Sequence, residues 1–508
     1  MIRLGTKCVF GIPGEGASLL LINELEKHGC RFYIAAHEAA GALMAGGYGR
    51  LAGIPGISLS IKGPGFSNML AGIASNWLDR NPALSLSESY GPGAPSFRMH
   101  KRMDHGAMVR PVSKAYADNS SPSLFGTLWE TCLAEEPGPV HLNISQRMDQ
   151  THIEGDSALA KSSNPCLLKL RESIQAASRP IVIAGSLASR RPWGRRLGTL
   201  NVPVFTTFAG KGAIDEMHPF SAGVFTNSGG IYSPESALLP EADLILGIGL
   251  RTSEIIDVKR LPAALFLLDE SPGRGDGLEA SLELSTTVEG IVEIIDILAD
   301  KEWGRSEIAT AKALLEAKLA VDRWLPSGAY RLSQQMLPES TIFFLDTGSF
   351  CTIGEHALIA QRPLHILGSA LGRSMGVCLP NAVGAAIAAR GTPVVAVTGD
   401  GGMRLYPECI SIAVKEKLPM LVMLMTDGYF SSIRQVAVEK GLSQNNLRMD
   451  SAGWIGAVEA WGCPSERVES LSAMQRALVA WKDSPSGPLF LELAFNSDAY
   501  MAMTDGIR

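Results

Sequence analysis

The most constraining stretch of the sequence runs from Val394 to Phe430 and reads VVAVTGDGGMRLYPECISIAVKEKLPMLVMLMTDGYF. An apolar segment leads into a Gly-Asp-Gly-Gly turn, a helix is expected at about 405–414, and a second apolar segment ends in Thr-Asp-Gly. This pattern predicts a βαβ unit. Because parallel crossovers are right-handed almost without exception, we expect Asp400 and Asp427 to emerge at the same, carboxyl, edge of the sheet.

The residues of this unit indicate a phosphate site. Gly399, Gly401 and Gly402 allow backbone amides to approach an anion at the start of the helix. Two carboxylates beside a phosphate would repel it unless a hard cation lies between them, and Mg²⁺ prefers oxygen ligands from carboxylates, carbonyls, water and phosphate. We therefore expect a diphosphate bridged by a metal ion. A lone Gly-Asp-Gly is also typical of a turn with one capping aspartate.

The turn Gly399-Asp400-Gly401, followed at Asp427 by an acid that closes an apolar strand, resembles a known signature. It is similar to that of thiamine diphosphate enzymes of the acetolactate synthase, 2-oxo acid decarboxylase and benzaldehyde lyase superfamily. The resemblance implies that Asp400, Asp427 and the backbone of Tyr429 hold Mg²⁺. The sequence departs from the pattern at Asp427, where the family usually has Asn, and the added charge bears on cofactor affinity and metal preference.

The first 155 residues alternate strand-like and helix-like segments, which predicts a parallel sheet covered on both faces. Segments such as CVFGIPGEG, HEAAGALMAGGYGR and KGPGFSNMLAGIASNWLDRNP resemble the pyrimidine-binding domain of the same superfamily. Glu38 follows the strand-like RFYIAA and begins a helix, where a carboxyl group can share a proton with a ring nitrogen. The resemblance implies that Glu38 bonds N1′ of the aminopyrimidine and promotes its imino form. The alternative is a first-turn glutamate that complements the helix dipole.

Residues 90–112, YGPGAPSFRMHKRMDHGAMVRPV, are rich in Gly, Pro and polar residues, which predicts a long loop without regular structure at its start. In the resembling enzymes this loop carries side chains that face the reacting substrate, which here implies His100 and Lys101, with His105 close by. His100 could donate a proton, and Lys101 could hold a carboxylate, phosphate or sulfonate group. A solvated basic loop is the alternative.

A chain of 508 residues is too long for one core. We expect three doubly wound α/β domains with mainly parallel sheets, at residues 1–155, 165–300 and 325–508. The resemblance makes these the pyrimidine-binding, central and diphosphate-binding domains. The central one has no Gly-x-Gly-x-x-Gly fingerprint after a strand, so FAD is not expected.

Two further positions in the third domain are candidate cofactor contacts. Gly348 and Ser349 close the strand-like IFFLDTGSF and form a second candidate phosphate edge. Met375 matches the bulky apolar residue that in the family wedges between the two rings of the cofactor. An ordinary core methionine is the alternative at this position.

Composition excludes several classes of protein. The net charge is −6 and no basic stripe with interleaved aromatic residues is present, so nucleic acid is not an expected partner. No apolar run approaches the roughly 18 residues of a membrane span, and no signal-peptide core follows the start, so we expect a cytoplasmic protein. The family usually has a full helix before the strand at Val9, which predicts a truncated start or unusual N-terminal packing.

The expected function is a thiamine diphosphate- and Mg²⁺-dependent enzyme that cleaves or forms C–C bonds next to a carbonyl of a 2-oxo acid or hydroxyketone. The favoured reaction is decarboxylation with acyl transfer to a second carbonyl, because Lys101 favours an anionic donor or acceptor. Simple decarboxylation, hydroxyketone cleavage and a non-catalytic cofactor-binding relative stay open. The resemblance implies a homodimer or homotetramer, with the pyrimidine domain of one subunit facing the diphosphate domain of another.

Overall fold

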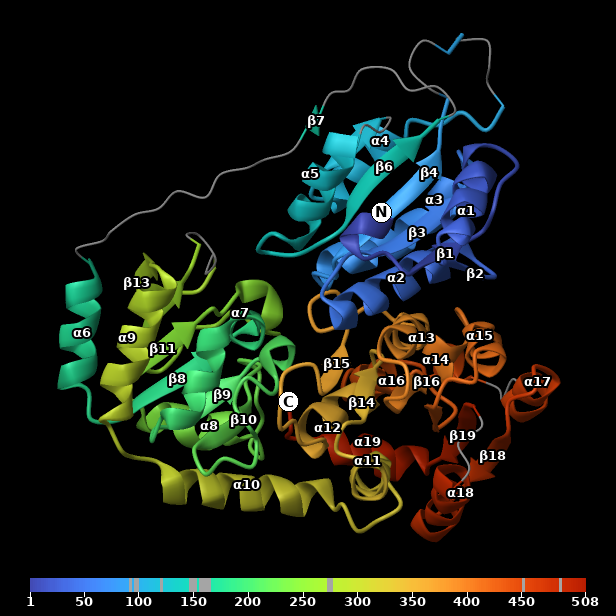
Figure 1. The fold of residues 1–508 in the computed structure, drawn as a ribbon. Coiled ribbons are helices and arrows are strands. Elements are labelled where there is room, and N and C mark those ends of the chain that lie inside the picture. The colour runs from blue at the N-terminus through green and yellow to red at the C-terminus, as the bar shows by residue number, and fades with distance from the viewer. Residues whose placement is uncertain are drawn as a thin grey trace.

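The computed structural model describes residues 1–90, 94–95, 100–118, 122–145, 153–154, 166–271, 277–449, 453–483 and 487–508. Its strands form three separate sheets in the N-terminal, central and C-terminal parts of the chain, with helices packed on their faces (Figure 1). The paired strands run parallel, apart from the antiparallel pair β5–β7. The predicted fold class, three α/β units with mainly parallel sheets, is confirmed.

The N-terminal sheet has seven strands in the order β2-β1-β3-β4-β6-β5-β7. Its strands are β1 (Cys8–Gly11), β2 (Arg31–Ile34), β3 (Gly56–Ser60), β4 (Ala83–Glu88), β5 (Tyr116–Asp118), β6 (Val140–Ile144) and β7 (Ile153–Glu154). Its helices are α1 (Ala17–Lys27), α2 (Glu38–Ala52), α3 (Pro64–Leu78), α4 (His105–Val109) and α5 (Pro122–Leu133). Strands β3 and β4 are buried at every residue, as central strands of a sheet covered on both faces must be.

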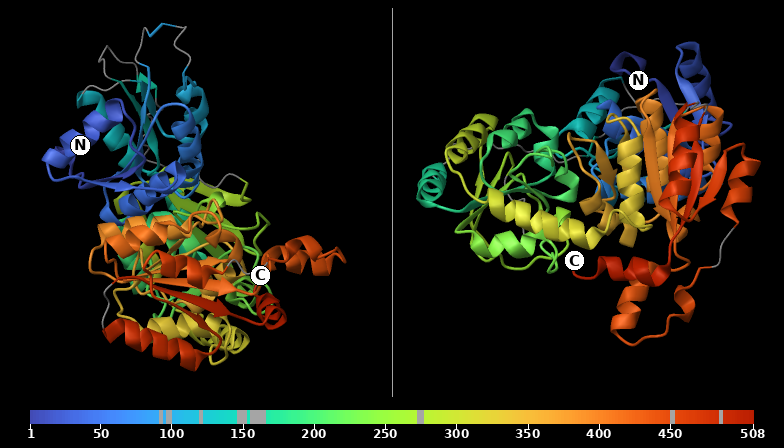
Figure 2. Two further views of the ribbon diagram at one scale, coloured as in Figure 1. Left: turned by 90° about the vertical axis from the view of Figure 1, so that its right-hand side faces the viewer. Right: turned by 90° about the horizontal axis from the view of Figure 1, so that it is seen from below.

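The central sheet has six parallel strands in the order β10-β9-β8-β11-β12-β13. They are β8 (Pro180–Ala184), β9 (Val204–Thr206), β10 (Ser221–Val224), β11 (Leu244–Ile248), β12 (Ala264–Asp269) and β13 (Ala280–Ser285). The helices are α6 (Cys166–Ala176), α7 (Ser186–Arg190), α8 (Pro234–Leu238), α9 (Val288–Ala299) and the connecting α10 (Arg305–Leu319). Helix α10 contacts α8 and α12, and so runs beneath both the central and the C-terminal units (Figure 2).

The C-terminal sheet also has six parallel strands, in the order β15-β14-β16-β17-β19-β18. They are β14 (Ile342–Leu345), β15 (Ile366–Gly368), β16 (Val394–Gly399), β17 (Met420–Thr426), β18 (Ser465–Val468) and β19 (Leu489–Ala494). The helices are α11 (Pro326–Met336), α12 (Ser349–Ala357), α13 (Cys378–Ala388), α14 (Asp400–Met403), α15 (Cys409–Lys415), α16 (Ser431–Glu439), α17 (Trp454–Ala460), α18 (Leu471–Asp483) and α19 (Ser497–Thr504).

The single helix predicted at about 405–414 is wrong in its bounds. The structure has α14 directly after β16 and a separate α15 that starts at Cys409. Pro407 lies between them and has no backbone N–H to continue a helix, so the chain turns before the second helix begins.

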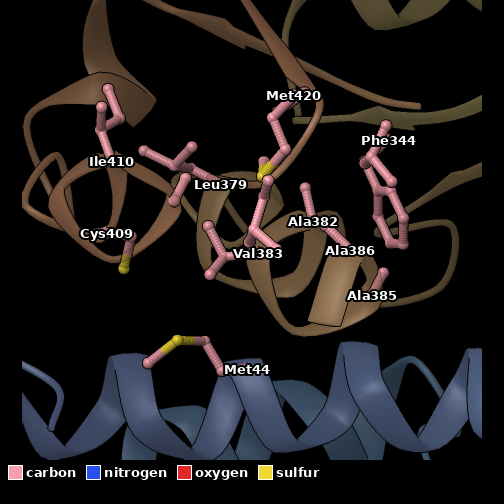
Figure 3. Close-up of a cluster of buried hydrophobic side chains, with 14 of the residues drawn as sticks. Met44, Phe344, Leu379, Ala382, Val383, Ala385, Ala386, Cys409, Ile410 and Met420 are labelled. Atoms are coloured by element: carbon pink, nitrogen blue, oxygen red, sulfur yellow. The ribbon is translucent and has the colours of Figure 1, made fainter. Parts of the chain in front are cut away.

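Helix α2 packs directly on α13, and this contact joins the N-terminal unit to the C-terminal one (Figure 3). A Cβ atom at Gly47 would lie 2.0 Å from the carbonyl oxygen of Asn381, and one at Gly384 would lie 1.9 Å from the carbonyl oxygen of Met44. The two helix backbones therefore touch at glycines. The Met44 side chain reaches into the buried apolar cluster that contains Val383.

Among the described residues, no helix combines the length and the apolar character needed to cross a lipid bilayer.

The contact between α2 and α13 can be tested with Gly47→Ala. The added methyl group meets backbone atoms that cannot yield, so we expect unfolding free energy to fall by about 1–3 kcal/mol. Gly126→Ala is the matched control, because nothing lies within 4 Å of a Cβ there. It should raise stability by up to about 1 kcal/mol through helix propensity. Urea unfolding midpoints followed by circular dichroism measure both changes, and equal behaviour of the two variants would contradict the close contact.

Candidate active site

Parallel pairing of β16 with β17 brings Asp400 and Asp427 to one edge of the C-terminal sheet. The register pairs Gly399 with Met425, so both strands end at the same level. The Asp427 amide donates a hydrogen bond to Asp400 Oδ2 at 3.2 Å. The two carboxylates that the sequence singled out therefore lie side by side.

Hydrogen bonds hold the Asp400 carboxylate at the end of the neighbouring strand β17. Thr426 Oγ1 donates to its Oδ1 at 2.7 Å, and the amide of Gly428 donates to its Oδ2 at 3.2 Å. Burial raises the pKa of Asp400, and the nearby charge of Asp427 adds to the increase, against the effect of these hydrogen bonds. A cation at this edge would offset the repulsion between the two carboxylates.

Asp427 is held by hydroxyl groups from two helices. Ser431 Oγ donates to it at 2.7 Å, and Ser497 Oγ from α19 donates at 2.8 Å. Arg434 in turn donates to Ser497 Oγ at 2.6 Å and to Asp498 at 2.7 Å, and its guanidinium lies 4.5 Å from the centre of the Tyr429 ring. The side chain of Arg434 is therefore occupied within the chain and places a positive charge behind Asp427.

Glycines at this edge are required by close neighbours. A Cβ atom at Gly348 or Gly399 would lie 2.5 or 2.7 Å from the Phe350 ring. One at Gly401 would lie 2.8 Å from Met375 Sδ. Met375 thus lies directly over the turn that carries Asp400, and its side chain is 40% exposed in the single chain.

The remaining predicted positions of this unit lie at the same edge. Ser349 is buried and begins α12 directly after Gly348. The Tyr429 carbonyl oxygen accepts a long hydrogen bond of 3.5 Å from Ser431 Oγ. The third glycine of the turn, Gly402, faces a carboxylate that the sequence reasoning missed.

That missed residue is Asp346, which is 1% exposed and lies under the turn. It accepts hydrogen bonds from the Gly376 amide at 2.8 and 2.9 Å and from Thr398 Oγ1 at 2.9 Å, and a Cβ at Gly402 would lie 1.9 Å from its Oδ2. Burial raises its pKa to about 6 against these hydrogen bonds. The available signal was an acid closing the strand-like IFFLD, the same arrangement that drew attention to Asp400.

Glu38 is the first residue of α2 and is 8% exposed. Asn68 Nδ2 donates to its Oε2 at 3.1 Å, and a Cβ at Gly65 would lie 3.1 Å from its Oε1. His37 caps the helix by accepting a hydrogen bond from the Ala39 amide at 3.1 Å. The carboxylate is therefore fixed at the carboxyl edge of the N-terminal sheet.

The predicted loop is described in part, since residues 91–93 and 96–99 lie outside the described residues. His100 and Lys101 are both exposed, and Tyr90 Oη donates to the His100 carbonyl oxygen at 2.5 Å. His105 is buried, and its Nε2 accepts a hydrogen bond from the Gly63 amide at 3.1 Å. Burial lowers the pKa of His105. This histidine therefore holds the loop in place.

The site residues fall into two groups within one chain. The hydrogen bonds of Glu38 come from the N-terminal unit, and those of Asp400 and Asp427 come from the C-terminal unit. A link between the two units near the site is the contact of His37 with Tyr406, whose ring centres lie 5.7 Å apart.

Three family models match the chain in the same order as the three sheets. Residues 1–103 match the N-terminal TPP binding domain of thiamine pyrophosphate enzymes, residues 167–266 their central domain, and residues 346–493 their C-terminal TPP binding domain. Together these matches cover more than half of the chain. The protein belongs to the thiamine diphosphate enzymes of the acetolactate synthase and 2-oxo acid decarboxylase superfamily, and it is an enzyme of their carboligase and decarboxylase class.

Curated relatives are similar to it over nearly their whole length. The probable 2-ketoarginine decarboxylase AruI of Pseudomonas aeruginosa is 26% identical, covering 94% of this chain and 90% of the relative. The probable acetolactate synthase large subunit of Methanococcus aeolicus is 23% identical, covering 97% and 90%. The acetolactate synthase of Bacillus subtilis is 24% identical, covering 97% and 91%. The resemblance read from the motifs is confirmed.

The buried carboxyl group of Asp346 predicts a pH dependence of stability. Its ordinary pKa is 3.8 and its folded pKa is about 6, so between these values the folded chain holds a proton that the unfolded chain has lost. Its stabilising contribution is complete below about pH 4 and is lost as pH rises through 6. The loss is on the order of 3 kcal/mol. Asp346→Asn should remove this part of the slope.

Urea unfolding at pH 4.5 and pH 7 measures the slope for each protein. Asp322→Asn, at an exposed position, is the control and should keep the slope of the unmodified chain. An unchanged slope in Asp346→Asn would show that Asp346 does not titrate in this range.

Proposed function

We propose that this thiamine diphosphate enzyme requires Mg²⁺, releases CO2 from a 2-oxo acid and transfers the remaining acyl group to a second carbonyl compound. The observation that carries the proposal is the pair Asp400 and Asp427 at one sheet edge, beside the glycine turns at Gly348 and Gly399. A diphosphate and a hard cation are the ligands that suit such an edge.

The donor set fits Mg²⁺, because the carboxylates of Asp400 and Asp427 and the Tyr429 carbonyl offer only oxygen. No group of three or more His, Cys, Asp or Glu side chains able to hold a metal occurs among the described residues. The remaining ligands would then be water and diphosphate oxygens. This supports a cation that binds together with the cofactor.

Asp427 stands where the family usually has an amide, and a positively charged residue of this chain offsets its negative charge. Ser497 links its carboxylate to the guanidinium of Arg434. The guanidinium of Arg434 therefore lies one hydroxyl group away from the Asp427 carboxylate and offsets the negative charge that this acid adds to the site. The departure therefore supports retained metal binding and argues against the non-catalytic alternative.

Thiamine diphosphate, when bound, supplies a carbon nucleophile and an electron sink for bonds next to a carbonyl. We assign to Glu38 the task of holding a proton at the pyrimidine nitrogen, in the orientation that Asn68 fixes. Met375 would shape the cofactor from its exposed position over Gly401. His100 and Lys101 would face the substrate from the exposed loop, His100 as a proton donor and Lys101 as an anion contact.

The central unit supports the proposal that FAD does not bind. Where an anionic dinucleotide would meet the carboxyl ends of β8 and β9, the carboxylate of Glu254 is present instead. It accepts hydrogen bonds from the Ser186 amide at 2.8 Å, from Ser186 Oγ and from Thr207 Oγ1 at 2.8 Å. The negative charge of Glu254 at these strand ends would repel the diphosphate of a dinucleotide.

Product analysis tests the proposed reaction. With pyruvate, thiamine diphosphate and Mg²⁺, acetolactate would support acyl transfer, and acetaldehyde alone would support the second candidate, simple decarboxylation, which one relative's name favours. Thermal unfolding supplies an activity-independent readout. Cofactor with Mg²⁺ at 100 times the dissociation constant should stabilise the chain by about 2.7 kcal/mol, and Asp400→Ala should abolish this stabilisation. Absence of stabilisation in the unmodified chain would favour a non-catalytic relative.

We propose further that the active site forms between two copies of the chain. Glu38 is bonded within the N-terminal unit and Asp400 within the C-terminal unit, and exposed Met375 and Leu405 border the site and offer apolar surface to a partner. Burial of such surface is the main driving force for association.

Subunit mixing tests this arrangement. Homo-oligomers of Glu38→Gln and of Asp400→Ala should each be inactive. After mixing and subunit exchange, hybrids should regain activity, because one of their two sites then combines an intact Glu38 with an intact Asp400. Sites built within single chains would stay inactive in every hybrid. Light scattering coupled to size exclusion gives the oligomeric state of each sample.

A further inference from the structure

A cavity of about 330 Å³ lies at the carboxyl edge of the N-terminal sheet, on the side where β4, β6 and α4 meet in Figure 1. Its lining includes Lys62, Tyr90, Lys101, Arg102 and Asp118. A volume of this size admits a small organic acid and is at the low end for ligand pockets. The whole lining carries three cations, Lys62, Lys101 and Arg102, and two acids, Asp104 and Asp118.

The cavity adjoins the turn that contacts Glu38. A Cβ at Gly65 would lie 3.1 Å from Glu38 Oε1, and a Cβ at Gly63 would lie 2.3 Å from the Lys101 carbonyl oxygen. Two residues span at most about 7 Å of chain. The same short turn therefore has Glu38 on one side and the Lys101 segment on the other. The cavity therefore lies within one short turn of the Glu38 carboxylate.

The cations of the lining have spare hydrogen-bonding capacity. Lys101 is exposed and makes no hydrogen bond or ion pair with any residue of the described ranges. Lys62 is 24% exposed at its side chain and has Glu88 Oε2 at 3.5 Å, the outer limit of a hydrogen bond. Arg102 donates from Nη1 to a backbone carbonyl oxygen at 3.1 Å, which leaves its other N–H groups available.

The acids around the cavity are engaged in structural hydrogen bonds. Asp104 caps α4 by accepting from the Ala107 amide at 2.9 Å, and Asp118 accepts from Asn143 Nδ2 at 2.5 Å. Glu88 accepts from the amide and hydroxyl of Ser18 at 3.0 and 2.5 Å. Glu88 also forms an ion pair with Lys62 at 3.5 Å, so an anion that binds Lys62 competes with this carboxylate.

We propose that Lys62, Lys101 and Arg102 form a subsite for the second anionic group of a doubly charged 2-oxo acid, a carboxylate, sulfonate or phosphonate. Ammonium and guanidinium groups bind such oxyanions through charge-assisted hydrogen bonds. The inference rests on the proposed function, because it assigns the substrate class of that same site. Lys62, which the sequence motifs did not single out, becomes a specificity-determining residue.

Equilibrium binding tests the subsite without turnover. Isothermal titration of the full chain with 2-oxoglutarate, sulfopyruvate, phosphonopyruvate and pyruvate distinguishes the three anion types from an acid that lacks the second charge. At least one doubly charged acid should bind about tenfold more tightly than pyruvate. Lys62→Met and Lys101→Met should each reduce that preference about five- to tenfold.

Lys27→Met is the matched control. It removes the same charge from the same unit, but Lys27 is at the end of α1, which starts at this edge and runs to the opposite one, and it pairs with Glu24. The control should keep the full preference. Equal binding of all four acids, or a preference unaffected in Lys62→Met and Lys101→Met, would overturn the subsite.

Turnover separates the two proposals. CO2 release by the protein loaded with thiamine diphosphate and Mg²⁺ is measured for the same acids. If the lysine variants lose the binding preference but no acid releases CO2, the subsite stands and the proposed reaction fails. If CO2 is released with equal kcat/KM from pyruvate and from the doubly charged acids, in the unmodified chain and the variants alike, the reaction stands and the subsite is wrong.

Discussion

The direct contact between the backbones of α2 and α13 is the constraint on which the arrangement of this protein depends. Glu38 is the first residue of α2, and α13 follows the loop that carries Met375. Because glycines at the crossing exclude any side chain between the helices, a shift of one helix must be followed by the other. The helix that carries the acid of the N-terminal unit is thereby held against the unit that carries Asp400.

Much of the fold and part of the candidate site could be predicted from the sequence, because those features are encoded locally. The apolar segments around Asp400 and Asp427 predict parallel strands, and the handedness of crossovers then decides where both carboxylates emerge. That the glycines of the turn let backbone amides approach a phosphate stays a prediction. The neighbours they accommodate within the chain, the Phe350 ring and Met375, are far away in sequence and were not foreseen as a pair.

The features that sequence reasoning missed depend on contacts between distant segments. Ser497 donates to Asp427 across 70 positions of the chain, and Thr398 donates to Asp346 across 52. No spacing rule predicts such contacts, because they depend on how the strands and helices pack. The guanidinium of Arg434 is likewise bonded to Ser497 and Asp498, which follow it by more than 60 positions. The bounds of α14 and α15 were missed although Pro407 was visible in the sequence.

Asp346 bonds on one side to Gly376, at the end of the loop that carries Met375, and on the other to Thr398, at the end of the strand that leads to Asp400. Engineers who wish to remodel this pocket would find that the loop is not an independent module. A foreign loop at 369–377 has to donate the same hydrogen bond to Asp346. If it does not, Asp346 shifts, and so does the end of β16 at Thr398, which is bonded to it. Replacing the Met375 side chain alone would leave the hydrogen bonds of Asp346 to Gly376 and Thr398 in place.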